Sequence, residues 1–135
     1  MALYEILEDG TPRKVAGNGI SSSNMELVYT NNNVASGFAS QTLSLDLSKY
    51  KVVVIYCVAT NTAVTPNLCI VAPVGNTNAL HMRIAYWDSN ASKVRQTARQ
   101  VTSISNSGIT FGDAFFDGAT EASLFACIPK YIYAI

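Results

Sequence analysis

The stretch from residue 38 to residue 57 limits the possible folds of this chain more than any other. Three leucines, Leu43, Leu45 and Leu47, alternate with threonine, serine and aspartate. That period of two is typical of a β-strand with one buried and one solvated face. The run Val52–Cys57 follows directly, and it is β-branched and apolar on both faces. We therefore expect a half-buried strand followed by a central strand of a packed sheet.

Further runs with strand character recur along the chain, separated by turn signals at intervals of roughly 8–12 residues. Predicted strands are Glu26–Thr30, Phe38–Leu47, Val52–Ala59, Leu68–Val74, Leu80–Trp87, Lys93–Ile104, Ile109–Phe111, Leu124–Ile128 and Tyr131–Ile135. A helix over Ser92–Gln100 is an alternative, but its apolar positions are too few for an amphipathic face. Residues 112–120 are predicted to be a polar loop. The pattern predicts one all-β domain over residues 21–135, an antiparallel β-sandwich of jelly-roll-like type.

Residues 1–20 form a separate small unit in this interpretation. Two short extended pieces flank Asp9-Gly10, and an Asp-Gly pair between such pieces predicts a hairpin. An isolated hairpin is not stable in water, so we expect it to dock on the main domain, on a symmetry mate or on a larger assembly. The N-terminus lacks the layout of a signal peptide, and no run approaches the roughly 18 apolar residues of a membrane span. We expect a soluble protein that does not leave by the classical secretion route.

The charge content of the chain is low. Of its 135 residues 49% are hydrophobic and only 13% are charged, about half the usual charged share. Burial of neutral surface against identical subunits would explain this, although serine, threonine and asparagine could instead supply the missing polarity. Nine acidic and nine basic residues give a net charge of zero, which argues against nucleic acid as a partner. A basic stripe at strand spacing is expected to form a solvated or intersubunit face, and its members are Lys93, Arg95, Thr97 and Arg99.

The three cysteines, Cys57, Cys69 and Cys127, lie inside apolar runs. Their odd number and their neighbours predict free, buried thiols of a protein made in a reducing cytoplasm. A disulfide between Cys57 and Cys127 is the alternative.

No catalytic or metal-binding motif is evident. His81 is the single histidine, and no Gly-x-Ser-x-Gly elbow accompanies it, so we expect a structural or surface histidine. Asp113, Asp117 and Glu121 could frame a calcium loop, but loop polarity alone explains them. Glycosidase chemistry needs two converging carboxylates, and nothing selects a pair from these three and Asp88. We predict no enzyme activity, no cofactor and no metal.

Two short segments, at residues 87–90 and 115–118, have the chemistry of a shallow recognition site. Exposed aromatic rings stack on sugar faces, while short polar side chains bond hydroxyl groups. The predicted ligand-binding residues are Trp87, Asp88, Asn90, Phe115, Phe116 and Asp117. The alternative is that the aromatic rings fill the core or a subunit interface.

Three segments in order, Val28–Ile55, Ser107–Gly112 and Cys127–Ile135, resemble a β-domain of tail-fibre and minor structural proteins of bacteriophages and prophages. The leader Asp9–Gly19 is similar to the start of short phage structural proteins. The ending departs from the family pattern because Ala134 stands where glycine is expected.

This resemblance implies a homotrimeric virion protein of the fibre or receptor-binding type, made in the host bacterial cytoplasm. Residues 1–20 would join it to other virion proteins, and the β-domain would recognise a host surface glycan or protein without entering the membrane. The alternatives are an architectural head-fibre, decoration or baseplate protein, a cellular carbohydrate-binding module, or an enzyme that degrades polysaccharide.

Overall fold

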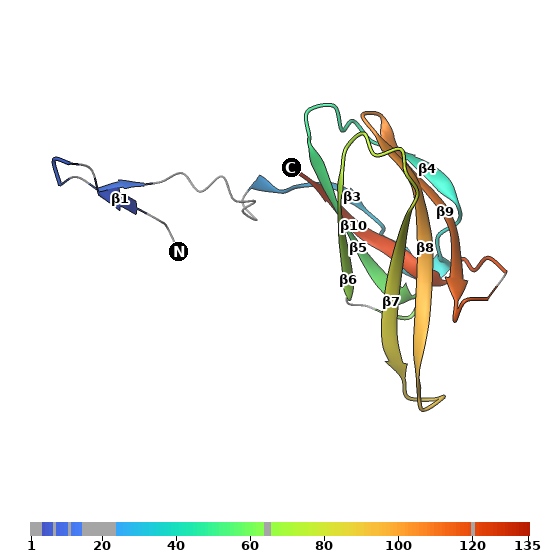
Figure 1. Ribbon diagram of the computed structural model, residues 1–135. Coiled ribbons are helices and arrows are strands. Elements are labelled where there is room, and N and C mark those ends of the chain that lie inside the picture. Colours follow the sequence, from blue (N-terminus) through green and yellow to red (C-terminus); the bar gives the residue numbers. More distant parts are fainter. Residues whose placement is uncertain (1–3, 7, 11, 15–23, 64–65, 120) are drawn as a thin grey trace.

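Two four-stranded antiparallel sheets pack face to face in this chain (Figure 1). The computed structural model describes residues 4–6, 8–10, 12–14, 24–63, 66–119 and 121–135. One sheet has the order β3 (Glu26–Thr30), β10 (Ala126–Ala134), β5 (Val52–Thr60), β6 (Leu68–Pro73). The other has the order β4 (Gln41–Ser44), β9 (Gly108–Phe116), β8 (Lys93–Ser105), β7 (Leu80–Asp88). The predicted β-sandwich is confirmed.

The connections are of two kinds, hairpins within one sheet and crossovers from one sheet to the other. β5–β6, β7–β8 and β8–β9 are neighbours within a sheet, whereas β3–β4, β4–β5, β6–β7 and β9–β10 pass between the sheets. The last strand, β10, lies between β3 and β5. The first sheet is therefore completed only when the C-terminal end of the chain inserts between strands from its first half.

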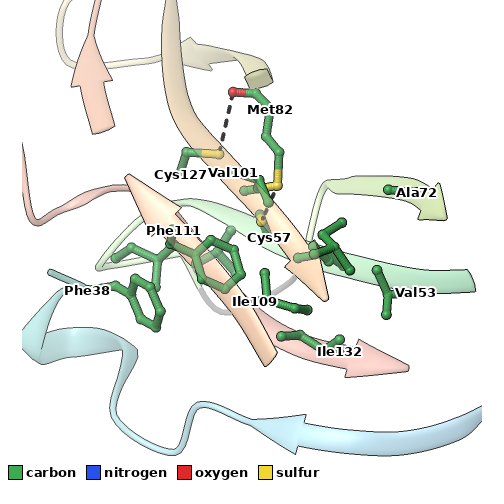
Figure 2. Packing of buried hydrophobic residues seen from close by; sticks show 14 of the residues in the cluster. Phe38, Val53, Cys57, Ala72, Met82, Val101, Ile109, Phe111, Cys127 and Ile132 are labelled. Carbon is green, nitrogen blue, oxygen red and sulfur yellow. Dashed lines mark hydrogen bonds between the residues drawn. The ribbon is translucent and has the colours of Figure 1, made fainter. Parts of the chain in front are cut away.

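The core follows from the two patterns that stand out in the sequence. β5 is buried along most of its length, and Val53, Ile55 and Cys57 belong to the core. Leu47 is fully buried, and Leu43 and Leu45 are half-buried against the same core. Figure 2 shows strands of both sheets contributing to one cluster, in which the rings of Phe38 and Phe111 meet edge to face at 5.2 Å.

The N-terminal hairpin is also present. β1 (Tyr4–Ile6) pairs with β2 (Pro12–Lys14) in antiparallel register. Gly10 has a φ of 80°, a conformation that glycine adopts without steric cost. Among the described strands the hairpin forms a sheet of its own.

Several predicted boundaries were wrong. β4 ends at Ser44. Beyond it, the amides of Leu45 and Leu47 still donate hydrogen bonds to the turn before β9, at the carbonyl oxygens of Ser107 and Asn106. The segment predicted as a polar loop after Phe111 instead continues β9 to Phe116. Gly112 suggested a turn, but a side chain there would collide with Gln100 on the neighbouring strand at 2.8 Å. Glycine here permits close packing of strands rather than a turn.

The strand predicted over Lys93–Ile104 is confirmed as β8, which runs to Ser105, and the alternative of a helix there is excluded. One further element differs from expectation. The last two predicted strands form the single strand β10, which holds Pro129 in its interior. The register of β10 against β5 shifts between Pro129 and Tyr131, and such a bulge is where a sheet accepts a residue without an N–H donor.

The basic stripe is not a solvated face. Thr97 and Arg99 are 0% and 1% exposed, because both lie on the face of β8 that points into the sandwich. The cysteine prediction was right for Cys57 and Cys127, which are buried and free, and wrong for Cys69, which is free and exposed. Cys69 pairs in register with Tyr56 on the outer face of β6. Among the described residues, no helix has the length and apolarity that a transmembrane span requires.

Candidate recognition surfaces

The two predicted ligand-binding segments meet at one end of the sheet β4-β9-β8-β7. Arg95 on β8 joins them. Its Nε donates to Asp88 Oδ2 at 2.7 Å, and its Nη1 donates to Asp117 Oδ2 at 2.9 Å. The ends of β7 and β9 are thereby tied to the strand between them.

Both carboxylates also accept hydrogen bonds from the backbone. Asp88 Oδ1 accepts from the amides of Asn90 and Ala91 at 3.0 and 3.2 Å, which closes the β7–β8 turn. Asp117 Oδ1 accepts from the Gln96 amide at 2.9 Å. The amide bond from Ala91 is the main cause that lowers the pKa of Asp88, and the bond from Gln96 does the same for the pKa of Asp117. The carboxylates of Asp88 and Asp117 therefore accept hydrogen bonds from Arg95 and from backbone amides, and these bonds hold the strand ends in place.

The aromatic residues divide between two faces of the sheet. Trp87 is 64% exposed and lies opposite Val94, which is 61% exposed. Phe115 lies opposite Ala98, whereas Phe116 lies opposite the buried Thr97. Because paired residues share a face, Trp87 and Phe115 belong to the outer face and Phe116 to the inner one. Trp87 therefore does not fill the core.

A second surface, on the other sheet, was missed by sequence reasoning. Tyr56, Tyr131 and Tyr133 line a hollow of about 530 Å³ together with Met25 and Pro66. The rings of Tyr56 and Tyr133 meet edge to face at 5.6 Å. The available signal was the sequence Tyr131-Ile132-Tyr133, in which Ile132 is buried in the core and the tyrosines lie on the opposite face.

The registers extend this surface across all four strands. One row runs Leu27, Tyr133, Val54, Val71, and the next runs Thr30, Tyr131, Tyr56, Cys69. Neither row holds a charged side chain. The outermost members of the first row, Leu27 and Val71, are 53% and 59% exposed. We call these two rows the tyrosine face.

The residues considered for catalysis or metal binding do not gather. Among the described residues no three His, Cys, Asp or Glu side chains are grouped as a metal site would require. Asp113 accepts a hydrogen bond from the Ser40 hydroxyl at 2.6 Å, while Asp117 belongs to the Arg95 cluster. His81 is exposed on β7, and its imidazole forms no hydrogen bond with the described residues.

The buried thiols are not placed for nucleophilic chemistry. Cys57 Sγ lies 3.6 Å from Met82 Sδ, and Cys127 Sγ lies 3.9 Å from the Met82 carbonyl oxygen (Figure 2). A hydrogen bond with Cys127, together with burial, raises the pKa of the Cys57 thiol. A thiol held protonated in an apolar core is inert, so Cys57 acts as a packing group.

Comparison with protein-family models, with curated proteins and with solved structures finds no match to this chain.

Proposed function

We propose that this chain is a structural protein of a bacteriophage virion, a homotrimeric fibre or receptor-binding module that recognises the host cell surface. The proposal rests on the sequence resemblance to phage fibre domains. The tyrosine face is the structural observation that supports it best.

The tyrosine face has the composition of a subunit interface. The cores of such interfaces are depleted in charge and enriched in tyrosine and methionine. Tyr131 and Tyr133 occupy the centre of this face, and Met25 lies beside them. The two rows themselves hold no charged side chain, and the nearest cation, Lys130 Nζ, lies 5.5 Å from the centre of the Tyr131 ring. We assign the occupant of this face as further copies of this chain.

The opposite outer face differs in character. It carries Arg83, His81 and Gln96 beside the aromatic side chains of Trp87 and Phe115, a mixture that suits contact with water or with a ligand. In the proposed assembly the tyrosine face is buried between subunits and the outer face of β7, β8 and β9 points away from the symmetry axis.

The mass of the protein in solution tests this assembly. Light scattering should give three times the 14.5 kDa of one chain. Val71→Glu places a charge in the tyrosine face and should give monomers. The matched control is Val94→Glu on the opposite sheet, since Val94 is 61% exposed and Val71 is 59% exposed. A monomeric parent protein, or the same mass for both variants, would contradict the proposal.

Residues 1–20 are proposed to attach the module to other virion proteins, and the virion is its proposed location. A purely architectural role, as a head-fibre, decoration or baseplate protein, is the second candidate. It is favoured by the internal engagement of Asp88 and Asp117 with Arg95. Reproducible binding on a glycan array that is lost in Trp87→Ala would decide for recognition. A blank array together with no binding of the protein to whole host cells would decide for architecture.

A further inference from the structure

A hollow of about 240 Å³ lies on the outer face of the sheet β4-β9-β8-β7, away from the tyrosine face. Its lining residues are His81, Arg83, Gln96, Thr97, Ala98, Phe115, Gly118 and Ala119. We call it the Arg83 hollow. Its volume falls below the range of about 300–1,000 Å³ that holds drug-sized ligands, so its occupant must be small.

Small side chains produce the hollow. Ala98 on β8 lies opposite Arg83 on β7 and opposite Phe115 on β9. The short alanine between two long neighbours leaves space above the middle strand. Gly118 and Ala119, which follow β9, complete the wall.

The hollow is cationic and offers unused hydrogen-bond donors. Arg83 forms no ion pair with any described residue, and no carboxylate lines the hollow. The adjacent acid, Asp117, is engaged by Arg95 and by the Gln96 amide. In a chain of zero net charge, an unpaired guanidinium at the wall of a hollow is free to pair with an external anion.

The remaining lining groups restrict the kind of anion. A guanidinium presents two parallel donors that match a carboxylate. The Phe115 ring supplies a flat apolar surface, which a sugar ring can cover with its C–H face. Gln96 and His81 add the hydrogen-bonding groups that sugar hydroxyls require.

We propose that the Arg83 hollow binds a carboxylate-bearing sugar, with the carboxylate on Arg83 and the ring against Phe115. This inference deepens the proposed host recognition, and rests on it, by naming the class of glycan: an acidic sugar unit of a surface polysaccharide.

Titration of the ¹⁵N-labelled protein with methyl glucuronide, followed by NMR, tests the inference. The amide signals of Arg83, Ala98 and Phe115 should shift, and methyl glucoside should leave them in place. Arg83→Gln should weaken binding about 10-fold or more, since a charge-assisted bond contributes about 1.5–3 kcal/mol. Phe115→Leu keeps apolar volume but removes the ring face, and should weaken binding about 3-fold to 10-fold.

Two further variants distinguish a specific contact with Arg83 from a general effect of positive charge on binding. Lys51→Gln removes one exposed positive charge at the start of the other sheet and should leave binding unchanged. Arg83→Lys keeps the charge but loses the paired donors, and should give intermediate affinity.

Three results would overturn the inference: no shift with glucuronide, equal binding of glucoside, or tighter binding of methyl glucose 6-phosphate. The last would identify phosphate rather than carboxylate as the anion. These results are independent of the assembly test. A trimer without glucuronide binding contradicts only the assigned ligand, and a monomer that binds glucuronide contradicts only the assigned assembly.

Discussion

Arg99 occupies an environment unusual for an arginine. It is 1% exposed and pairs with no carboxylate among the described residues. Its guanidinium donates to the carbonyl oxygens of Cys127 and Phe38 at 2.8 Å, of Gly112 at 3.1 Å and of Ala126 at 3.2 Å. Burial lowers the pKa of Arg99. One side chain thereby links β8 to β9, to β10 and to the segment before β4.

Removal of this guanidinium should destabilise the fold. Arg99→Met fills similar volume but removes the donor from three buried carbonyl oxygens and from the partly buried one of Gly112. We therefore expect the free energy of unfolding to fall by about 2–4 kcal/mol. Urea denaturation measures the change. The exposed control Arg83→Met should stay within about 0.5 kcal/mol of the parent protein. Equal stability of the two variants would show that the carbonyl oxygens find other donors.

Thr97 lies two residues before Arg99 on the same face of β8 and, unlike Arg99, lacks a hydrogen-bond partner for its side chain in the described part of the chain. Its hydroxyl oxygen is buried and has no hydrogen-bond partner among the described residues. Thr97→Val replaces the hydroxyl by a methyl group of nearly equal size and should raise the free energy of unfolding by about 1–2 kcal/mol. Thr102→Val is the control, because the Thr102 hydroxyl donates to the Thr110 carbonyl at 3.2 Å, and that variant should lose stability. A loss in both variants would rule out an unsatisfied hydroxyl at Thr97.

At the scale of elements, the ends of β7, β8 and β9 are fixed by charge rather than by apolar packing. Arg95 lies between Asp88 and Asp117, in the β7–β8 hairpin, which extends beyond the other strands (Figure 1). Strand ends that are not packed against apolar side chains need other interactions to keep them paired. The network of three charged side chains provides those interactions.

This network predicts how stability depends on pH. The pKa values of Asp88 and Asp117 in the folded protein lie below their ordinary value of 3.8. The unfolded chain therefore takes up protons first as the pH falls, so the contribution to stability is present above pH 3.8 and is lost on acidification through the lower folded pKa values. The melting temperature of the double variant Asp88→Asn, Asp117→Asn should depend less steeply on pH in that window. Equal slopes for the variant and the parent would contradict this account.

Strands were predicted correctly where a single sequence pattern, an apolar run or a period of two, extended along the whole strand. The β-branched apolar run over Val52–Cys57 indicates a buried strand, which is β5. The strand predicted over Leu80–Trp87 is β7, and its period of two puts Met82 and Ile84 in the core and Trp87 outside. Prediction failed at Gly112 and Pro129, which usually mark turns and strand ends. Here Gly112 accommodates the side chain of Gln100, and Pro129 lies at a bulge. Both depend on the neighbouring strand, which no local pattern reveals.

At the scale of the whole molecule, the two outer faces of the sandwich differ. The tyrosine face is uncharged, and the face that holds the Arg83 hollow carries unpaired polar groups. The N-terminal hairpin pairs with neither sheet among the described residues. Among the residues whose burial the structure describes, Val28 is the first that belongs to the core cluster or packs against it.

Deletion of residues 1–20 should therefore leave the sandwich folded. We expect an unchanged β-sheet circular dichroism spectrum and a melting temperature within about 3 °C of the parent, because the core residues that the structure describes all lie after this segment. In the proposed virion role the truncated protein should no longer be incorporated into particles, as measured by immunoblot of purified virions. Normal incorporation would refute attachment through this segment, and a large loss of melting temperature would show that the hairpin supports the fold.

The sequence by itself determined the fold class, because a period of two and a β-branched run leave few ways to bury apolar side chains other than a two-layer sheet structure. It also located the hairpin at Asp9-Gly10 and identified the segments that Arg95 brings together. Only the tertiary structure decided which side chains of different strands lie together on one face. The tyrosine face, the Arg83 hollow and the burial of Arg99 all arise from strand registers between segments far apart in the chain, and a one-residue change of register would place each of them on the other side of its sheet.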